Sequence, residues 1–251
     1  MLAAVLGLTG YAVLIDDGND PTPQYGGAMS TPSPVAPTTT ASPQPAPMYS
    51  VPPTWTEPRR WLAVSRGARK AANGREIGFP DTADGAIGMM AAASLMDVEG
   101  SDTLTNQHLA VYRTYMLPSE QSPTAEAKVR QGAEETDAGT RRALGLPSRG
   151  PLPSGAFMRA TMIGIKTIQV SPALVTAYVL TVVTDKGGEM VPEQRVYTVG
   201  LLGAVWQDGD WKLSGQAVKA GTTQSDQGPA IAAPGDAAFN TAGWTAIRQA
   251  S

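Results

Sequence analysis

The chain has 251 residues, a formal net charge of −3, a single histidine and no cysteine. The lack of cysteine excludes disulfide frameworks, and one histidine without cysteine excludes the common zinc sites. Because nucleic-acid binders present an excess of Lys and Arg, the mild acidity also argues against direct nucleic-acid binding.

The chain begins with an uncharged apolar run over residues 1–15, followed at once by Asp16 and Asp17. As a helix this run spans about 22 Å, short of the roughly 30 Å hydrocarbon core of a bilayer. Three interpretations fit: the distal part of a transmembrane helix, the apolar region of a signal peptide, or a buried helix. A signal peptide carries a positive n-region, yet no Lys or Arg precedes Arg59. We therefore favour a partial transmembrane helix over residues 1–15.

The flank that follows this run is acidic, and the positive-inside rule places Lys and Arg on the cytoplasmic side. We therefore expect a single-pass protein of the cell membrane whose C-terminal domain is extracytoplasmic. The membrane is accordingly its first expected partner.

Residues 16–58 form a linker rich in Pro, Thr and Ser. Eleven of the 21 prolines in the chain lie within residues 21–58, where Glu57 is the only charged residue. This composition has too little apolar surface to offset the entropy of ordering, and it favours extended polyproline II. We expect a disordered tether. Recognition by Pro-reading domains and O-glycosylation of its Thr and Ser are weaker alternatives.

A folded domain is predicted over residues 59–220, followed by a Gly/Pro-rich tail over residues 221–251 that has room for a short helix. The domain is long enough to build one hydrophobic core. A basic cluster opens it: Arg59, Arg60, Arg66, Arg69, Lys70 and Arg75. A solvated connector or first helix explains this cluster most simply, and the alternative is contact with anionic lipid headgroups or an acidic partner.

Helices are predicted in the first half of the domain. Residues 82–96 repeat small apolar residues at helical spacing, after a cap at Asp81 or Thr82. A second helix begins at Ser101 or Asp102 and ends at the next proline.

A third helical region covers residues 124–144, which are rich in Ala, Glu and Arg and poor in large apolar residues. Few apolar residues mean that little of such a helix can be buried. We expect one helix on the surface, or two short helices broken near Gly132 or Gly139.

The second half of the domain changes to strands. Residues 157–170, 174–184, 194–206 and 211–215 are apolar and β-branched, and turn residues separate them. The last turn contains Asp208-Gly209, which suits positive φ at both central positions of a hairpin. Helices followed by an antiparallel meander predict an α+β fold, with N-terminal helices packed on one curved antiparallel sheet.

The closing hairpin, residues 205–213, reads Val-Trp-Gln-Asp-Gly-Asp-Trp-Lys-Leu. It resembles the W-x-D-G-D-W-K-L hairpin of the NTF2-like superfamily, and with the preceding helices and strands it implies an NTF2-like cone over about residues 74–215. With the apolar stub and the Pro-rich tether, the layout resembles membrane-anchored conjugation proteins of actinobacteria, similar to the VirB8 and TcpC components of type IV secretion systems. The short stub, without a basic cytoplasmic flank, departs from that pattern.

The resemblance implies a non-catalytic extracytoplasmic scaffold that pairs with itself or with other envelope or secretion-channel proteins. Folds of this kind host enzymes, binders and scaffolds alike, so fold does not settle function. A plain secreted or cell-surface protein is a further possibility. The alternative we keep open is a tethered small-ligand-binding module, or an NTF2-like enzyme that uses the cone pocket.

Such enzymes place a His/Asp or Tyr/Asp pair inside the cone. Here the only histidine, His108, shares a helix face with Tyr112 and Tyr115. We expect a structural histidine; a general base requires Asp97, Asp102 or a carboxylate of the sheet within hydrogen-bond reach. The carboxylates of the strand-rich half lie near turns, at Glu189, Glu193, Asp208 and Asp210. The sequence therefore predicts no catalytic, cofactor-binding or metal-binding residues.

Aromatic residues mark both ends of the domain. Trp55 and Trp61 bracket the junction with the tether, where they either dock the tether onto the domain or contact a membrane or partner. The tail holds Phe239, Trp244 and Ile247 among small residues. We expect it to cap the sheet with a short helix, or to order only with a partner.

Overall fold

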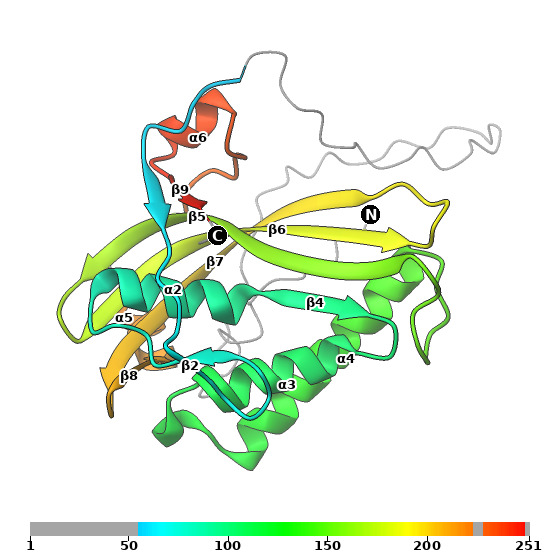
Figure 1. The fold of residues 1–251 in the computed structure, drawn as a ribbon, viewed down its shortest axis with the longest axis horizontal. Coiled ribbons are helices and arrows are strands. Elements are labelled where there is room, and N and C mark those ends of the chain that lie inside the picture. Colours follow the sequence, from blue (N-terminus) through cyan, green and yellow to red (C-terminus); the bar gives the residue numbers. More distant parts are fainter. Residues whose placement is uncertain (1–54, 223–227, 249–251) are drawn as a thin grey trace, which may run out of the picture.

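The computed structural model describes residues 55–222 and 228–248, which form an α+β fold (Figure 1). Within these residues a seven-stranded mixed sheet curves around a layer of helices and is not closed. The predicted membrane segment, residues 1–15, and the predicted linker as far as residue 54 lie outside the described residues. Each of the described helices is too short or too polar to span a bilayer.

The elements follow one another in two blocks. The first block holds short strands and helices: β1 (Trp61–Ala63), β2 (Arg69–Lys70), β3 (Glu76–Ile77), α2 (Ala83–Ser94), β4 (Met96–Glu99), α3 (Leu104–Tyr115), the 3₁₀ helix η2 (Pro118–Glu120) and α4 (Pro123–Ala143). The second block holds the long strands and the C-terminal elements: β5 (Ala156–Val170), β6 (Leu174–Gly187), β7 (Gln194–Gln207), β8 (Asp210–Leu213), α5 (Gly215–Thr222), α6 (Ala237–Thr241) and β9 (Thr245–Arg248). The strand order of the large sheet is β1-β9-β5-β6-β7-β8, with β4 beside β5.

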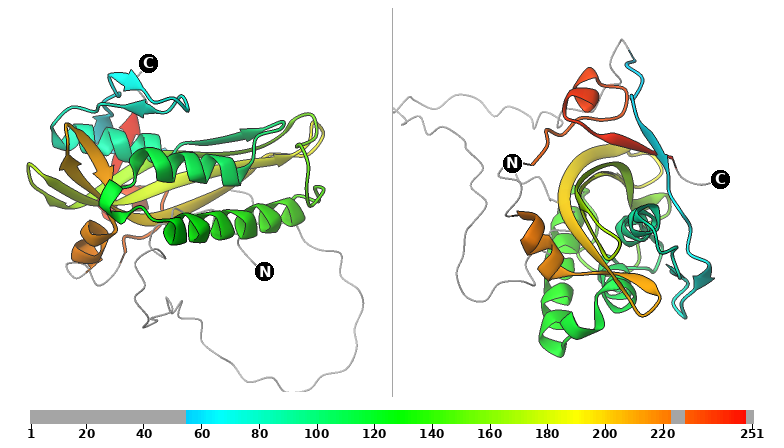
Figure 2. Two further views of the ribbon diagram at one scale, coloured as in Figure 1. Left: turned by 90° about the horizontal axis from the view of Figure 1, so that it is seen from below. Right: turned by 90° about the vertical axis from the view of Figure 1, so that its left-hand side faces the viewer.

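The two faces of the sheet carry different helices (Figure 2). α2, α3 and α4 lie in the concave face, where they bury the main hydrophobic core against β5–β8. α5 and α6 lie on the convex face, where Phe239 and Trp244 pack on Leu180 of β6. The four strands predicted within residues 157–215 are confirmed as β5–β8, whose β-branched and apolar side chains pack on both faces.

The first predicted helix is confirmed as α2. Thr82 caps it, since its hydroxyl accepts a hydrogen bond from Gly85 N at 3.0 Å. Glycine is required at two positions: a Cβ at Gly85 would lie 1.9 Å from Pro80 O, and one at Gly88 would lie 2.2 Å from Ser65 O. The small residues of α2 therefore let two backbone segments pass directly over the helix.

The end of the first predicted helix differs from the sequence prediction, whereas the third helical region takes the single-helix form of its two predicted alternatives. α2 ends at Ser94, and the residues that follow form β4, because inward-facing Met96 and Val98 alternate with outward-facing acidic residues. α4 is one unbroken helix. A Cβ at Gly132 or Gly139 would meet nothing within 4 Å, so neither glycine marks a bend or a close contact.

The sequence predicts an antiparallel sheet, but the sheet is mixed. β9 lies between β1 and β5, parallel to β1 and antiparallel to β5. The segment 245–248, which the sequence places in a tail outside the domain, is therefore a strand of the sheet. Its apolar side chains account for this, since Trp244, Ala246 and Ile247 are all buried. β1 and β9 are distant in sequence, so local patterns carry no sign of their pairing.

The closing hairpin holds the start of α2 against the sheet. Asp210 is buried and accepts hydrogen bonds from the backbone N–H groups of Gly78, Phe79 and Trp211, each at 3.0 Å. The indole of Trp211, which is 1% exposed, donates from Nε1 to Pro80 O at 2.8 Å. Two consecutive hairpin residues therefore fix the segment that leads into α2.

We expect Asp210→Asn to lower the free energy of unfolding by about 2 kcal/mol, because one amide oxygen replaces only part of the acceptor capacity of the carboxylate. Asp208→Asn is the matched control, since Asp208 is exposed in the same hairpin at φ 52°, a conformation that Asn tolerates. Urea unfolding followed by far-UV circular dichroism measures both variants. Equal losses in the two would contradict the role assigned to Asp210.

Candidate functional site

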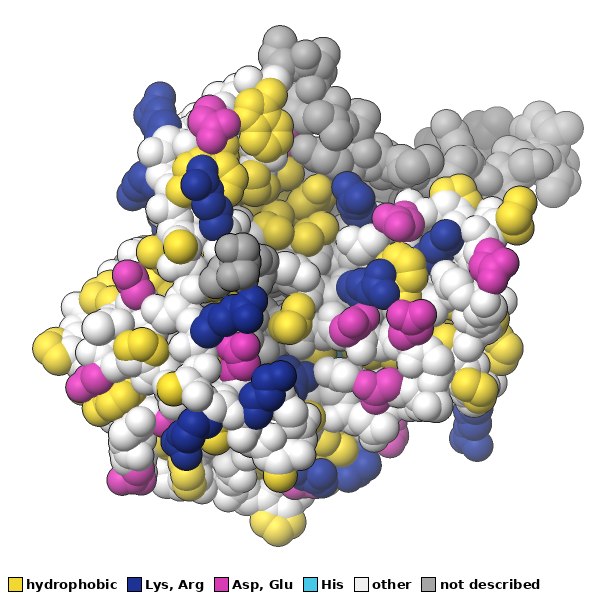
Figure 3. Space-filling view, in the orientation of Figure 1, with side chains coloured by type: hydrophobic (Ala, Val, Ile, Leu, Met, Phe, Trp, Pro, Cys, Tyr) yellow, Lys and Arg dark blue, Asp and Glu magenta, His cyan; other side chains and the backbone are white. Residues whose placement is uncertain are grey.

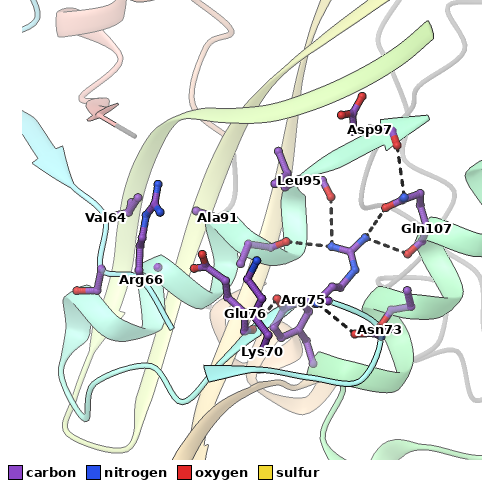
Figure 4. A pocket seen from close by; sticks show the side chains of 16 residues that line it. Val64, Arg66, Lys70, Asn73, Arg75, Glu76, Ala91, Leu95, Asp97 and Gln107 are labelled. Atoms are coloured by element: carbon purple, nitrogen blue, oxygen red, sulfur yellow. Dashed lines mark hydrogen bonds between the residues drawn. The ribbon is translucent and has the colours of Figure 1, made fainter. Parts of the chain in front are cut away.

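A cleft of about 450 Å³ opens beside the sheet, between the β2–β3 hairpin, the C-terminal half of α2, and α3 (Figure 4). Small residues of α2 line one side of it, namely Gly88, Ala91 and Ala92. Five charged side chains also line it: Arg66, Lys70, Arg75, Glu76 and Asp97. The cleft therefore combines a small-residue wall with groups of both charges, three of them cationic.

Arg75 forms hydrogen bonds between the elements that surround the cleft. Its guanidinium donates hydrogen bonds to Ala92 O at 3.2 Å and to Leu95 O at 3.3 Å, at the C-terminus of α2. It also donates to Gln107 of α3, to the backbone oxygen at 3.3 Å and to Oε1 at 2.7 Å. A cation at a helix C-terminus is favourable, because the last carbonyl groups lack partners within the helix. Arg75 thus joins the β2–β3 hairpin to two helices.

His108 lies beside this network and is not among the residues that line the cleft. Burial, followed by the positive charge of Arg75, lowers the pKa of His108 to about 4. The imidazole is therefore neutral near pH 7 and is a weak proton acceptor. This environment favours the structural histidine that the sequence predicts.

The two carboxylates considered as partners for His108 are engaged elsewhere. Asp97 binds Arg159 Nε through Oδ1 at 2.9 Å. Asp102 accepts hydrogen bonds from Thr103 N at 2.8 Å and from the side-chain amide of Gln107. Both carboxylates therefore have hydrogen-bond partners other than His108.

The four carboxylates near the predicted turns do not gather at one place. Glu189 accepts a hydrogen bond from Ser154 Oγ at 2.6 Å, and Glu193 lies 3.7 Å from Arg195. Asp208 and Asp210 lie in the β7–β8 hairpin, at another part of the sheet. Within residues 55–222 and 228–248, His, Cys, Asp and Glu form no group of three or more that suits a metal ion.

Asp185 is a group that sequence reasoning treats only as part of a turn. It lies in β6 at a position that faces the concave side, like Val179 and Val183 of the core. Its Oδ1 is buried without a hydrogen-bond partner among the described residues, and burial raises the pKa of Asp185 to about 6. The period-two pattern of β6 is the signal that predicts its direction, once the strand is extended past residue 184.

The two tyrosines on the histidine face are used in packing. The Tyr112 hydroxyl accepts a hydrogen bond from Ser122 N at 2.9 Å, and the Tyr115 hydroxyl donates to Glu76 O at 2.8 Å. Burial raises the pKa of Tyr115 to about 12. Both side chains lie in the main core at 1% exposure, and Tyr115 also lines the cleft.

The basic cluster predicted at the start of the domain is split in two. Arg59 and Arg60 lie beside the C-terminal elements, where Arg59 N donates to Asn240 Oδ1 at 2.8 Å and Arg60 donates to Gly243 O at 2.6 Å. The other members lie in or near the β2–β3 hairpin: Arg66, Arg69, Lys70 and Arg75. The cluster is therefore neither a single helix nor a single patch.

Compared with known protein families, curated proteins and solved structures, the chain has no match. The interpretation of the cleft therefore depends on its own geometry. That geometry provides a solvent-facing hollow with fixed walls, and it brings no nucleophile, base and orienting group together among the residues described above.

We expect Arg75→Lys to lower the free energy of unfolding by about 2 kcal/mol, because an ammonium cannot reproduce the planar fork that spans α2 and α3. Arg69→Lys, in the exposed strand β2, is the matched control and changes stability by less than about 0.5 kcal/mol. Thermal unfolding by calorimetry compares the two. A stable Arg75→Lys variant would show that this network does not hold the helices together.

The half-buried side chains of His108 and Asp185 predict opposite dependences of folding stability on pH. The lowered pKa of His108 means that the unfolded chain takes up the proton first, so stability falls as pH drops from about 6.5 to 4. Burial raises the pKa of Asp185 from 3.8 to about 6, so the folded chain keeps this proton when the unfolded chain has lost it. The stability that Asp185 contributes is full below about pH 3.8 and is lost as pH rises through about 6. The two slopes offset each other in the unmodified protein.

Single variants separate the two slopes. Asp185→Asn should raise the melting temperature relative to the unmodified protein at about pH 7.5 but not at about pH 3.5. His108→Gln should leave the Asp185 slope without its offset, so that the stability of this variant rises as pH falls from about 6 to 4. Melting curves across this range measure both effects, and parallel pH profiles in all three proteins would contradict the assigned environments.

Proposed function

We propose that this chain is a membrane-tethered, non-catalytic scaffold subunit that works outside the cytoplasm in a conjugation or type IV secretion-like machine. In this proposal the apolar run over residues 1–15 anchors the chain, the Pro-rich linker spaces it, and an NTF2-like cone makes the contacts. The α+β fold, with helices packed inside a curved sheet, is compatible with that cone.

The observation that supports this role best is the filled concave face of the sheet. Met89 and Met90 of α2, Tyr112 and Tyr115 of α3, and Trp211 of β8 are all 1% exposed or less. A ligand-binding or catalytic cone needs an open interior lined by a few polar groups. Here packed apolar side chains take up that space, so the domain is better suited to contacts through its outer surface.

The outer surface offers an apolar contact point at the connection between β6 and β7. Met190 is 95% exposed, and Val191 and Val196 are also exposed. Exposed apolar groups that lie together mark interaction surfaces more often than isolated ones. A scaffold subunit would use such a loop to bind a neighbouring envelope protein or a second copy of itself.

The alternative function, a tethered module that binds a small ligand, retains one supporting observation. The cleft beside α2 has a volume of about 450 Å³, which lies within the range of small-molecule sites. Its mixed charges favour a polar ligand. The enzyme form of this alternative has less support, because His108 is a weak base in its environment.

The proposal is tested on the full chain, expressed in an actinobacterial host that carries a conjugative element. We expect the protein to remain in the membrane fraction after alkaline washing and to form cross-linked species larger than the monomer. Met190→Asp should weaken the cross-linked species, whereas Ser148→Asp, which adds the same charge to another exposed loop, should not. A chain that is released by alkaline washing and stays monomeric would rule out the scaffold.

A further inference from the structure

We propose that the domain docks on anionic lipid headgroups through an exposed surface made of Trp55, Glu57, Arg59, Arg60, Trp61 and Arg248, here called the Trp–Arg face. This inference rests on the proposed membrane anchor. It adds that the domain itself contacts the bilayer, next to the point where the tether enters it.

The aromatic groups of the Trp–Arg face are exposed yet held in place. Trp55 is 56% exposed and Trp61 is 37% exposed. The Glu57 carboxylate accepts a hydrogen bond from each indole, from Trp55 Nε1 at 2.9 Å and from Trp61 Nε1 at 2.9 Å. One carboxylate therefore fixes two large side chains, which lowers the entropy lost when they enter an interface.

Neighbouring groups add to this order. The Arg248 guanidinium lies over the Trp61 ring, 4.6 Å from its centroid. Trp55 packs on Gly235, where a Cβ would lie only 2.3 Å from the ring, and Thr56 N donates to Gly235 O at 2.8 Å. The face thus joins the first residues of the domain to its C-terminal elements.

The charge of the Trp–Arg face matches an anionic surface. Three arginines and one glutamate give a formal charge of +2 for the face, in a chain whose net charge is −3. The indole hydrogen bonds lower the pKa of Glu57, so its carboxylate stays ionised and engaged with the two rings. Figure 3 shows basic and apolar side chains lying together with acidic ones over the part of the molecule that carries β1 and the C-terminal elements.

Lipid is the occupant that the chemistry of the Trp–Arg face favours. Trp lies readily at the boundary of headgroups and acyl chains, and Arg binds phosphate through two parallel hydrogen bonds. A basic residue near an anionic membrane contributes about 1 kcal/mol, which is weak for so few arginines alone. The face lies where residues 16–54 join the domain, so an anchored chain keeps lipid at a high effective concentration and makes weak contacts sufficient.

The experiment uses the full chain reconstituted in vesicles of phosphatidylcholine, alone or mixed with phosphatidylglycerol, whose acyl chains carry bromine. Bromine quenches tryptophan only at close range. We expect quenching in the mixed vesicles, a loss of at least half of it in the double variant Trp55→Phe/Trp61→Phe, and a similar loss in Arg59→Gln/Arg60→Gln. The matched controls are Trp206→Phe in β7 and Arg149→Gln on an exposed loop, which should leave the quenching unchanged.

The possible outcomes separate the docking from the anchor. A chain that pellets with vesicles without tryptophan quenching would retain the anchor and overturn the docking. A chain that does not pellet would overturn both. Quenching reduced equally by the control variants would show that the Trp–Arg face is not the contact, as would quenching that is the same with and without phosphatidylglycerol. Circular dichroism confirms that each variant is folded.

Discussion

The joint between the closing hairpin and the segment before α2 is the contact on which the rest of the fold depends. Asp210 gathers three backbone N–H groups, and Trp211 binds a carbonyl one residue further along the segment. These bonds fix where α2 begins. α2 in turn carries Met89 and Met90 into the concave face, where burying a side chain of this size contributes about 2 kcal/mol. The helix and the sheet are therefore oriented together by two adjacent residues.

This arrangement bears on function because packed apolar side chains fill the concave face of the sheet. With α2 held in place, apolar side chains pack together on the concave face. Nearby polar side chains form hydrogen bonds to the backbone of the domain. Tyr115 binds the backbone of β3, and Arg75 binds the ends of α2 and α3. Groups with so many internal partners are poorly placed to meet a substrate. The proposed scaffold role places recognition on the outer surface of the domain.

The sequence predicts the local features of this fold well and the distant contacts poorly. β-branched runs predict β5, β6 and β7, and the Asp-Gly turn predicts the positive φ of Asp208 and Gly209, because these features depend on neighbouring residues. β9 is not predicted, since its short run of apolar residues becomes a strand only between β1 and β5. The membrane segment and the resemblance to secretion proteins stay predictions.

The candidate sites show the same division. The sequence marks Trp55 and Trp61 at the tether junction and leaves two alternatives for them, docking of the tether onto the domain or contact with a membrane or partner. It does not reveal that Glu57 binds both indoles or that Arg248 stacks on one of them. Arg75 likewise belongs to a basic run in the sequence, yet its partners come from two helices. Charged residues can be counted from a sequence, whereas the groups that each charged side chain binds are determined by the fold.

The long strands give the two proposed contact surfaces a spatial relationship. The Trp–Arg face lies on the side of the sheet that carries β1 and β9, where β9 pairs with Gly164 and Ile165 near the middle of β5, while the β6–β7 connection lies at one end of the long strands (Figure 1). β6 has 14 residues, so at about 3.3 Å per residue it extends for roughly 45 Å. Val179 of β6 pairs with Ile165, so eight residues, or about 26 Å, of β6 lie between this side and Gly187, where the β6–β7 connection begins. A domain docked by the Trp–Arg face would therefore present Met190 at a distance from that face. In the proposed scaffold, one sheet would then connect a lipid contact on its β1–β9 side to a protein contact at the end of its long strands.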